Sequence, residues 1–313
     1  MKAKLILVTG GLGFIGKHFV QQCLSEGHFV TNVDVMNYAA DRFANEKFKA
    51  HGNYRHLLKD ITTLDYLPEC DYLINFAAES HVDNSIADSR KFCLSNVVGM
   101  QNLLELSRAK HASGAPRFIQ ISTDEVYGDI VDGRHKETDL LRPSNPYSST
   151  KAAADMLLLG WSRTYKLSYN IIRMTNNYGS NQYPEKLIPK SAWRMRRGLP
   201  ALVHGDGSYV RSWLHVEDSV EAIMKIIDKG ESNSIYNIHG DSEFKNIEII
   251  KKLAILLDVP ETKAFITIPN RVGQDVRYSL DDSRVRGLGW KPQKNFDEEL
   301  KKIAFEDDFK RFL

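Results

Sequence analysis

The sequence has few cysteines and no long hydrophobic run, and each shortage excludes a class of protein. Three cysteines, Cys23, Cys70 and Cys93, are scattered among 313 residues at no metal-like spacing. This pattern predicts free thiols, with no disulfide framework and no metal site. No apolar run is long enough to cross a membrane, and the run that follows residues 1–4 is too short for the core of a signal peptide. We therefore expect a cytoplasmic protein without a membrane partner.

The chain also lacks an excess of charge of either sign. Its formal net charge is only +2, so no global field attracts nucleic acid, and we expect no nucleic-acid partner. Hydrophobic residues make up 42% and charged residues 26% of the chain, which is typical of a globular protein with a sizeable core. No internal repeat and no low-complexity segment interrupts it.

What the first half contains is an alternation of short apolar runs with longer helix-like segments. The runs predict strands over residues 5–9, 29–33, 72–76, 118–122 and 168–173. Helices are predicted over residues 15–26, 87–112 and 146–165. Strands that alternate with helices indicate an α/β fold with a doubly wound parallel sheet of the Rossmann type. At the other end, residues 297–313 mix charges at helical spacing and predict a solvated surface helix.

A glycine-rich turn follows the first predicted strand. Gly11, Gly13 and Gly16 fit the dinucleotide-binding fingerprint, and Gly10 in place of Gly11 gives its close variant. Glycines there permit a tight turn, let the backbone approach a pyrophosphate, and let the helix pack on the strand. The start of the helix then offers free N–H groups to the anion. Glycines also mark plain turns, but the preceding strand and following helix favour a dinucleotide site.

The second predicted strand ends in an acid about twenty residues further along, as the fingerprint requires. This acid, Asp34, can accept hydrogen bonds from a ribose diol and would repel a 2′-phosphate, which favours NAD over NADP. Asp60 and Ile61 follow a third strand, which is expected before Asp60 without defined bounds, and Ala77 and Ala78 follow the fourth, over residues 72–76. Both pairs fall at the edge of the sheet where a dinucleotide would lie. From Asn176 onward the elements shorten and Gly, Pro and Arg become more frequent. We therefore expect an NAD-binding domain over residues 1–177 and a smaller α/β substrate-binding domain over residues 178–313, with the chain crossing between the two.

Tyr147 and Lys151 lie four residues apart at the start of a predicted helix, so both face the same side. An ammonium beside a phenol favours the phenolate and lowers the pKa of the tyrosine from about 10. Such a phenolate takes a proton from a hydroxyl whose carbon gives a hydride to NAD. A Tyr-x-x-x-Lys pair is often only a solvated helix face, but its place behind an NAD fingerprint favours the catalytic interpretation.

Two adjacent carboxylates, Asp124 and Glu125, follow Thr123 at the end of a buried apolar run. Neighbouring carboxylates repel each other and disfavour the strand that carries them. A surface Asp-Glu pair in a loop is the alternative, and it fits poorly directly after such a run. Two carboxyls with different pKa values can serve as an acid and a base in one reaction.

These features together resemble those of the extended short-chain dehydrogenase/reductases, and more narrowly of the nucleotide-sugar 4,6-dehydratases, of which the dTDP-glucose enzyme is the type. The resemblance runs almost from end to end of the chain. The matching stretches are residues 77–83, 122–128, 176–179, 184–189, 205–207 and 210–211, besides the glycine turn and the Tyr147/Lys151 pair.

The resemblance implies a hydro-lyase reaction on a dTDP-glucose or UDP-glucose type of substrate. NAD oxidises the C4 hydroxyl of the hexose, water leaves across C5 and C6, and the hydride returns to C6 to give a 4-keto-6-deoxyhexose. Asp124 would be the acid and Glu125 the base, with Thr123 on the C4 oxygen beside Tyr147 and Lys151.

By the same resemblance further residues are assigned to the ligands, and the protein is expected to be a homodimer through the helices of residues 87–112 and 146–165. His81 has a structural hydrogen bond as an equal alternative to a substrate contact. The cofactor contacts implied are Gly10, Gly13, Phe14, Ile15, Gly16, Asp34, Asp60, Ile61, Ala77, Ala78, Ser80, Ser95, Tyr147, Lys151 and Asn177. The substrate contacts implied are His81, Thr123, Asn176, Glu185, Lys186, Leu187, Arg211, Asn246, Arg271 and Tyr278.

Three departures from the family pattern leave the nucleotide base open: Asn84 stands where an arginine is usual, Gln274 where a histidine is usual, and residues 37–41 follow the usual sequence only in part. A nucleotide-sugar 4-epimerase is the alternative enzyme, since it shares the fold, NAD, the tyrosine and the lysine. The acid pair argues against it, because C4 epimerisation needs no elimination. A regulatory module without catalysis would be expected to lose Tyr147 or Lys151, and both are present.

Overall fold

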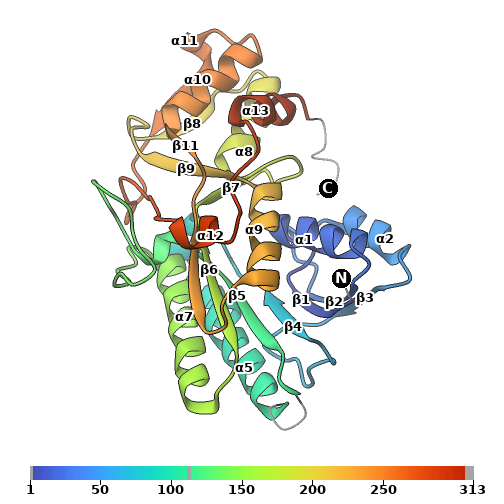
Figure 1. Ribbon diagram of the computed structural model, residues 1–313. Helices are drawn as coiled ribbons and strands as arrows, with labels where there is room; N and C mark the ends of the chain where they lie inside the picture. The colour runs from blue at the N-terminus through green and yellow to red at the C-terminus, as the bar shows by residue number, and fades with distance from the viewer. Residues whose placement is uncertain (1–2, 111–113, 307–313) are drawn as a thin grey trace.

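The computed structural model describes residues 3–110 and 114–306. Its main feature is a parallel sheet of seven strands in the order β10-β6-β5-β4-β1-β2-β3 (Figure 1). The winding reverses at β1, which pairs with β2 on one side and β4 on the other. The predicted Rossmann-type α/β fold is confirmed. The strands are β1 (Leu5–Thr9), β2 (Phe29–Asp34), β3 (Tyr54–Leu58), β4 (Tyr72–Asn75), β5 (Arg117–Thr123), β6 (Tyr169–Met174) and β10 (Ser234–Ile238).

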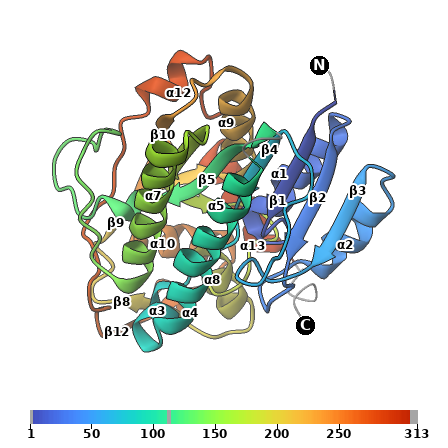
Figure 2. The ribbon, with the colours of Figure 1, turned by 90° about the horizontal axis from the view of Figure 1, so that it is seen from below.

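Helices cover both faces of this sheet, and each face has its own apolar core. One core lies under α1 (Phe14–Ser25), α2 (Arg42–Lys49), α9 (Val216–Lys229) and α12 (Ser283–Gly287). The other lies under α5 (Gly99–Ala109) and α7 (Pro146–Tyr165), which run side by side in Figure 2. The sheet is thus buried on both faces, as its continuous apolar strands predict.

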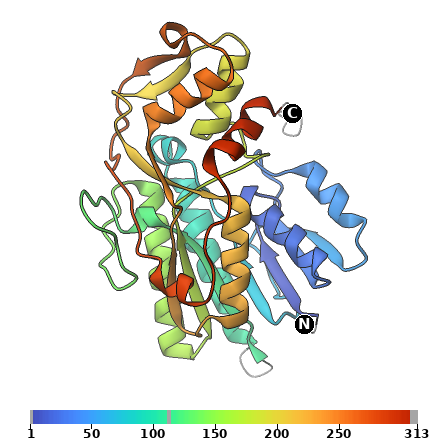
Figure 3. The same ribbon diagram turned by 45° about the horizontal axis from the view of Figure 1, so that its top comes forward.

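Most elements after residue 175 form a smaller body above the carboxyl ends of the large sheet, with a core of its own (Figure 3). Three strands pair in the order β11-β9-β7, and β8 pairs with β12. The rings of Tyr178, Trp213 and Phe296 meet in its centre. Its elements are β7 (Asn176–Tyr178), α8 (Leu187–Arg196), β8 (Ala201–His204), β9 (Val210–His215), β11 (Ser242–Lys245), α10 (Asn246–Leu256), α11 (Glu261–Ala264), β12 (Phe265–Ile268) and α13 (Phe296–Phe305).

The second half of the chain also returns to the large sheet. β10 pairs in parallel with β6, and α9 packs against α1. Trp290, which follows α12, is buried in the same core. The division of the chain at residue 177 stays a prediction, and these elements of the large sheet come after it.

Two predicted helices differ from the observed ones. The helix expected over 87–112 consists of α4 (Arg90–Phe92), a π-helical segment η1 (Cys93–Val98) and α5, and residues 111–112 lie outside the described residues. The described part of the surface helix expected over 297–313 is α13, which exposes its charges on one face only. α13 buries Phe296, Leu300 and Ile303 in the smaller core, because its apolar residues recur at helical spacing among the charges.

The helix α7 starts and ends where the sequence predicts, because its caps are local. Asn145 accepts a hydrogen bond from Ser148 N in a capping box, and Pro146 occupies the first helical position. The helix ends at Lys166, whose backbone is left-handed with φ 59°. This fixed start places Tyr147 and Lys151 on the buried face of the helix.

Candidate active site

A cavity of about 590 Å³ lies at the carboxyl ends of the large sheet, between the sheet and the smaller body. It sits where the winding reverses between β1 and β4, the place where ligands bind in open α/β sheets. Every residue that the sequence assigned to the cofactor lines this cavity. So do all five predicted catalytic residues, Thr123, Asp124, Glu125, Tyr147 and Lys151.

The glycine turn is built for close approach. Gly10 has φ 68°, and a Cβ at this position would lie 2.6 Å from the backbone nitrogen of Ala77. A Cβ on Gly16 would lie 2.3 Å from the carbonyl oxygen of Gly10. These contacts leave room for glycine only and hold the start of α1 against the ends of β1 and β4. The cradle therefore fits the pyrophosphate of a dinucleotide.

Asp34 lies at the end of β2 and is 8% exposed. Its Oδ2 accepts a hydrogen bond from Leu12 N at 2.9 Å, and its Oδ1 accepts one from Met36 N at 2.8 Å. Burial raises the pKa of this carboxyl, and the two backbone donors oppose the rise. The carboxylate thus braces the glycine turn and lines the cavity with oxygens that have lone pairs left for a ribose diol.

The acid pair lies in a single 3₁₀ turn, η2 (Asp124–Val126), directly after β5. Thr123 Oγ1 donates to Asp124 Oδ1 at 3.1 Å, and among the described residues none bonds to Asp124 Oδ2. Glu125 Oε2 instead accepts a hydrogen bond from Asn145 Nδ2 at 3.2 Å. The two carboxyls are therefore side by side in sequence but differ in their hydrogen bonds.

This difference separates their proton affinities. Burial, together with the charge of Glu125, raises the pKa of Asp124 to about 8. Burial also raises the pKa of Glu125, but the hydrogen bond from Asn145 and the charges of Arg211 and Lys186 oppose the rise. At neutral pH, Asp124 therefore keeps its proton while Glu125 is the better site for a negative charge.

Tyr147 and Lys151 are both buried, and they face the cavity from α7. Lys151 Nζ donates to the carbonyl oxygen of Ile121 at 2.7 Å, and burial lowers the pKa of the lysine to about 8. The pKa of Tyr147 is raised, first by burial and then by the charges of Glu125 and Asp124. The prediction that Lys151 lowers this pKa is therefore wrong, because burial and the acid pair dominate.

The residues assigned to the substrate fall into two groups. Thr123, Asn176, Glu185, Lys186 and Leu187 line the cavity. Five lie outside its lining, namely His81, Arg211, Asn246, Arg271 and Tyr278.

Several of the second group already have protein partners. Arg271 forms a two-pronged ion pair with Asp83, at 2.5 and 2.9 Å. Arg211 donates to the backbone oxygens of Val210 and Asp275, and its guanidinium lies 4.5 Å from the ring centre of Tyr278.

His81 Nδ1 is buried and has no hydrogen-bond partner among the described residues. The alternative role as a structural hydrogen bonder therefore finds no support at that atom.

Two residues that the sequence analysis did not single out shape the site. Asn145 caps α7 and holds Glu125, and the Asn-Pro pair before a predicted helix was the available signal. Tyr38 donates from its hydroxyl to Glu185 Oε2 at 3.1 Å, which joins the loop after β2 to the loop before α8. That second contact depends on tertiary structure, and no local pattern predicts it.

Comparison with known families decides where the chain belongs. The profile of the GDP-mannose 4,6 dehydratase family matches residues 7–303. The chain belongs to this family. Over 94% of its length it is 40% identical to a low-salt glycan biosynthesis protein of Haloferax volcanii, covering 96% of that protein. It is 38% identical to the dTDP-glucose 4,6-dehydratase of Neisseria gonorrhoeae, with 96% of this chain and 94% of that one covered.

Solved structures of family relatives agree with this placement. The dTDP-glucose 4,6-dehydratase of Streptomyces venezuelae, solved with NAD bound, superposes with a TM-score of 0.91 at 37% identity, over 96% of this chain and 95% of that one. The UDP-glucose 4-epimerase of Thermotoga maritima superposes with a TM-score of 0.86 at 28% identity, over 96% and 97%. The fold is thus shared by dehydratases and epimerases and does not distinguish between them. The distinction depends on the acid pair, Asp124 and Glu125.

The described parts of the chain lack two features, a membrane-spanning helix and a metal-binding cluster. No helix within residues 3–110 and 114–306 has the length and apolar character needed to cross a membrane. Nor do these residues contain a group of three or more His, Cys, Asp or Glu side chains placed to hold a metal ion.

Proposed function

We propose that this protein is an NAD-dependent hydro-lyase that converts a nucleotide-linked hexose of the dTDP-glucose or UDP-glucose type to the 4-keto-6-deoxy sugar. The observation that carries the proposal is the buried acid pair on η2, with two different proton affinities, in the same cavity as Tyr147 and Lys151. An elimination of water needs both an acid and a base within reach of one substrate.

The environment of each carboxyl supports its role. Asp124 holds a proton at neutral pH and is the acid that protonates the departing C6 hydroxyl. Glu125 is the base that removes the C5 proton, since Asn145 and two nearby cations favour its charged form. Thr123 lines the cavity beside the pair, and its hydroxyl would bond the C4 oxygen.

Tyr147 exchanges the proton of the C4 hydroxyl. Because Asp124 is protonated at neutral pH, one of the three carboxylate charges that raise the pKa of Tyr147, those of Glu125, Asp124 and Asp155, is absent there. Lys151 keeps most of its positive charge at that pH, since its pKa is about 8. NAD, held by the glycine turn and Asp34, would supply the redox chemistry by taking the C4 hydride and giving it back at C6.

The test is a substrate panel with the purified protein. It is incubated separately with dTDP-glucose, UDP-glucose, GDP-mannose and UDP-N-acetylglucosamine, and the products are identified by mass. A 4-keto-6-deoxy product lighter than its substrate by one water is expected from dTDP-glucose or UDP-glucose. Turnover of GDP-mannose alone would reject the proposed substrate and keep the reaction.

An isotope experiment separates the dehydratase from the epimerase. Deuterium placed at substrate C4 should reappear at product C6, and solvent deuterium should enter at C5. A C4 label that stays at C4 with inverted configuration would show an epimerase instead.

We also propose a homodimer formed through the helices of residues 87–112 and 146–165. Val98 on η1 and Met156 on α7 are 43% and 48% exposed although both are apolar, and η1 packs beside α7. Light scattering should give a dimer mass, and the pair Val98→Lys and Met156→Lys should shift it to a monomer. Ile255→Lys, at an exposed position on α10, is the matched control. A monomer mass for the unmodified protein would contradict the proposal.

We place the enzyme in the cytoplasm. All three cysteines are free, which suits a reducing compartment. Cell fractionation with an antibody against the protein tests this, and recovery outside the cytoplasm would contradict it.

A further inference from the structure

A buried arginine lies behind the catalytic cavity and does not line it. Arg173 on β6 is 1% exposed. Its Nε donates to Asp155 Oδ2 at 2.9 Å, and its Nη1 donates to the hydroxyl of Tyr127 at 2.7 Å. The guanidinium also lies 4.7 Å from the ring centre of Tyr127. A charge buried this deeply persists only where its donors are paired, so the three side chains form one fixed cluster.

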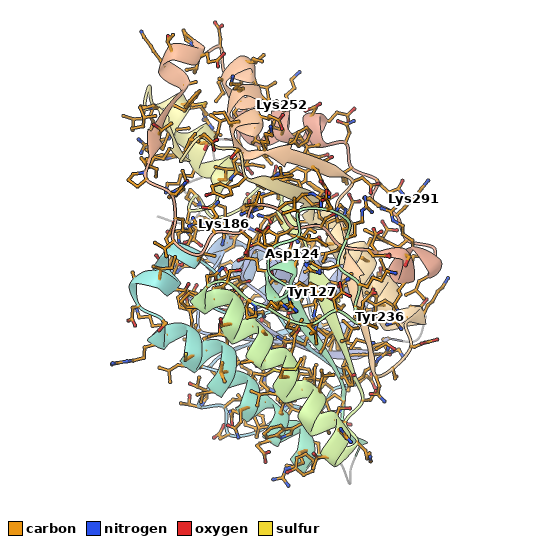
Figure 4. All side chains as sticks on the ribbon, turned by 90° about the vertical axis from the view of Figure 1, so that its left-hand side faces the viewer. Asp124, Tyr127, Lys186, Tyr236, Lys252 and Lys291 are labelled. Carbon is orange, nitrogen blue, oxygen red and sulfur yellow. The ribbon has the colours of Figure 1, made fainter. Side chains whose placement is uncertain are left out.

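One arm of this cluster reaches the acid pair. Tyr127 follows η2 directly, and its backbone N–H donates to the carbonyl oxygen of Asp124 at 3.0 Å. Its hydroxyl also donates to Asn237 Oδ1 on β10 at 2.9 Å. Figure 4 shows Asp124 and Tyr127 close together near the centre of the molecule. The turn that carries the acid and the base is therefore anchored to β6 and β10 through one phenol.

The other arm reaches the redox pair. Asp155 is fully buried and follows Lys151 by one turn of α7. Its negative charge raises the pKa of Lys151, against the larger lowering by burial. Titratable groups that line the cavity together with Lys151 include Tyr147 on its own helix, Asp124 and Glu125 on η2, and Lys91 of α4, while Arg173 on β6 is paired with Asp155.

We infer that Arg173, Tyr127 and Asp155 are positioning residues with separable duties: the Tyr127 arm fixes the acid pair for elimination, and the Asp155 arm, one helical turn from Lys151 on the buried face of α7, keeps the lysine charged for the redox step. The inference rests on the proposed function, since it assigns one arm to each part of that reaction. Its chemistry is confined to positioning, because none of the three side chains lines the cavity.

The first arm is tested with Tyr127→Phe, which keeps the ring under the guanidinium and removes only the hydroxyl. Displacing the acid pair should slow elimination on the order of ten- to a hundredfold, while the first oxidation continues. Rapid-quench samples should then contain more NADH and more undehydrated 4-keto sugar than those of the unmodified protein.

Tyr236→Phe is the matched control for this arm. Tyr236 is equally buried, its hydroxyl accepts a hydrogen bond from Glu231 N, and Arg284 lies 5.0 Å from its ring centre. It lies well away from Asp124 in Figure 4 and does not line the cavity. The ratio of NADH to product should be unchanged in this variant.

The second arm is tested with Asp155→Asn, which keeps an oxygen for Arg173 and removes the charge. A redox step that needs charged Lys151 is lost as pH rises through the pKa of the lysine. Loss of Asp155 should therefore move the basic limb of the single-turnover oxidation rate to lower pH, by about one to three units. Tyr127→Phe should leave that limb in place.

Asp218→Asn is the control for this arm. Asp218 is also buried, and it accepts hydrogen bonds from Gln293 N and Lys294 N away from the cavity. Its replacement should not move the limb. Thermal unfolding and NAD titration of every variant report whether the fold and the cofactor site persist.

Arg173→Lys gives a second test if Asp155→Asn does not fold. It keeps a cation beside Asp155 and loses the fork to Tyr127, so it should reproduce the slowed elimination without the pH shift.

Equal slowing of both steps in Tyr127→Phe or in Arg173→Lys, or a basic limb that stays in place in folded Asp155→Asn, would show a merely structural cluster and overturn the inference. That result, with product formed by the unmodified protein, leaves the proposed function standing. No 4-keto-6-deoxy product from the unmodified protein with any nucleotide sugar would overturn both.

Discussion

Replacing Asp124 with Asn should stabilise the folded protein at alkaline pH while it disables elimination. The carboxyl has a pKa of about 8 in the folded protein, against about 3.9 in an unfolded chain. Between these values the folded state binds a proton that the unfolded state has released. The free energy of unfolding therefore falls as pH rises through this window, and the loss is complete above about pH 8.

Asn does not ionise, so the variant avoids this loss. One pKa unit corresponds to about 1.4 kcal/mol, which gives an upper bound on the order of 6 kcal/mol for the gain above pH 8. The amide oxygen can still accept the hydrogen bond from Thr123, so the contacts of the site change little. A general acid contributes about a hundred- to ten-thousandfold to a rate, and elimination should fall by that factor.

The assay is urea unfolding followed by tryptophan fluorescence at several pH values from 5 to 8.5. The difference in unfolding free energy between Asp124→Asn and the unmodified protein should grow with pH and level off above about pH 8. Asp132→Asn, which removes an exposed carboxyl on a nearby loop, corrects for the general effect of one lost charge. A difference that is constant with pH, or that falls as pH rises, would refute the reasoning.

Three further variants test other parts of the site. Asp34→Ala should weaken NAD binding about ten- to a hundredfold in a titration, since it removes a charged hydrogen-bond acceptor, and equal turnover of the unmodified protein with NADP would contradict this role. Gly16→Ala should lower both NAD affinity and melting temperature, because its Cβ meets the backbone oxygen of Gly10. The control, Gly160→Ala, lies in open space on α7 and should stabilise the protein by about 0.5–1 kcal/mol. Equal effects of the two substitutions would contradict the packing argument. Tyr147→Phe should form neither NADH nor ketone in a rapid-quench experiment, and ketone formation at the unmodified rate would exclude Tyr147 as the proton acceptor.

Elements whose signals are local could be predicted to within a residue or two. The strand over residues 5–9 and the helix over residues 146–165 coincide with β1 and α7, because a buried parallel strand is continuously apolar and a capping box fixes a helix start. β3 was placed before Asp60 without bounds. It is an edge strand, and its partly exposed residues include Arg55 and His56, so its pattern is weak.

The parts that the sequence did not predict depend on distant contacts. The raised pKa of Tyr147 reflects burial and the charges of three carboxyls, and the helical spacing to Lys151 reports neither effect. The apolar spacing of α13 was present in the sequence, but the surfaces of α8 and α10 that cover this face come from distant parts of the chain. In the sequence, Arg173 is one polar residue within an apolar strand. Its role depends on its hydrogen bonds to Asp155 on α7 and to Tyr127 after η2.

The return of β10 to the edge of the large sheet matters while the chain is being made. About sixty residues separate the end of β6 from the end of β10, so at about 5–20 residues per second the ribosome needs several seconds to supply the missing neighbour. During that interval the edge of β6 is unpaired and the apolar face of α1 that packs against α9 is uncovered. An unpaired strand edge can pair with other chains in the cell. We expect the nascent protein to need a chaperone until residue 238 has emerged, and a chain that stops at residue 177 to aggregate.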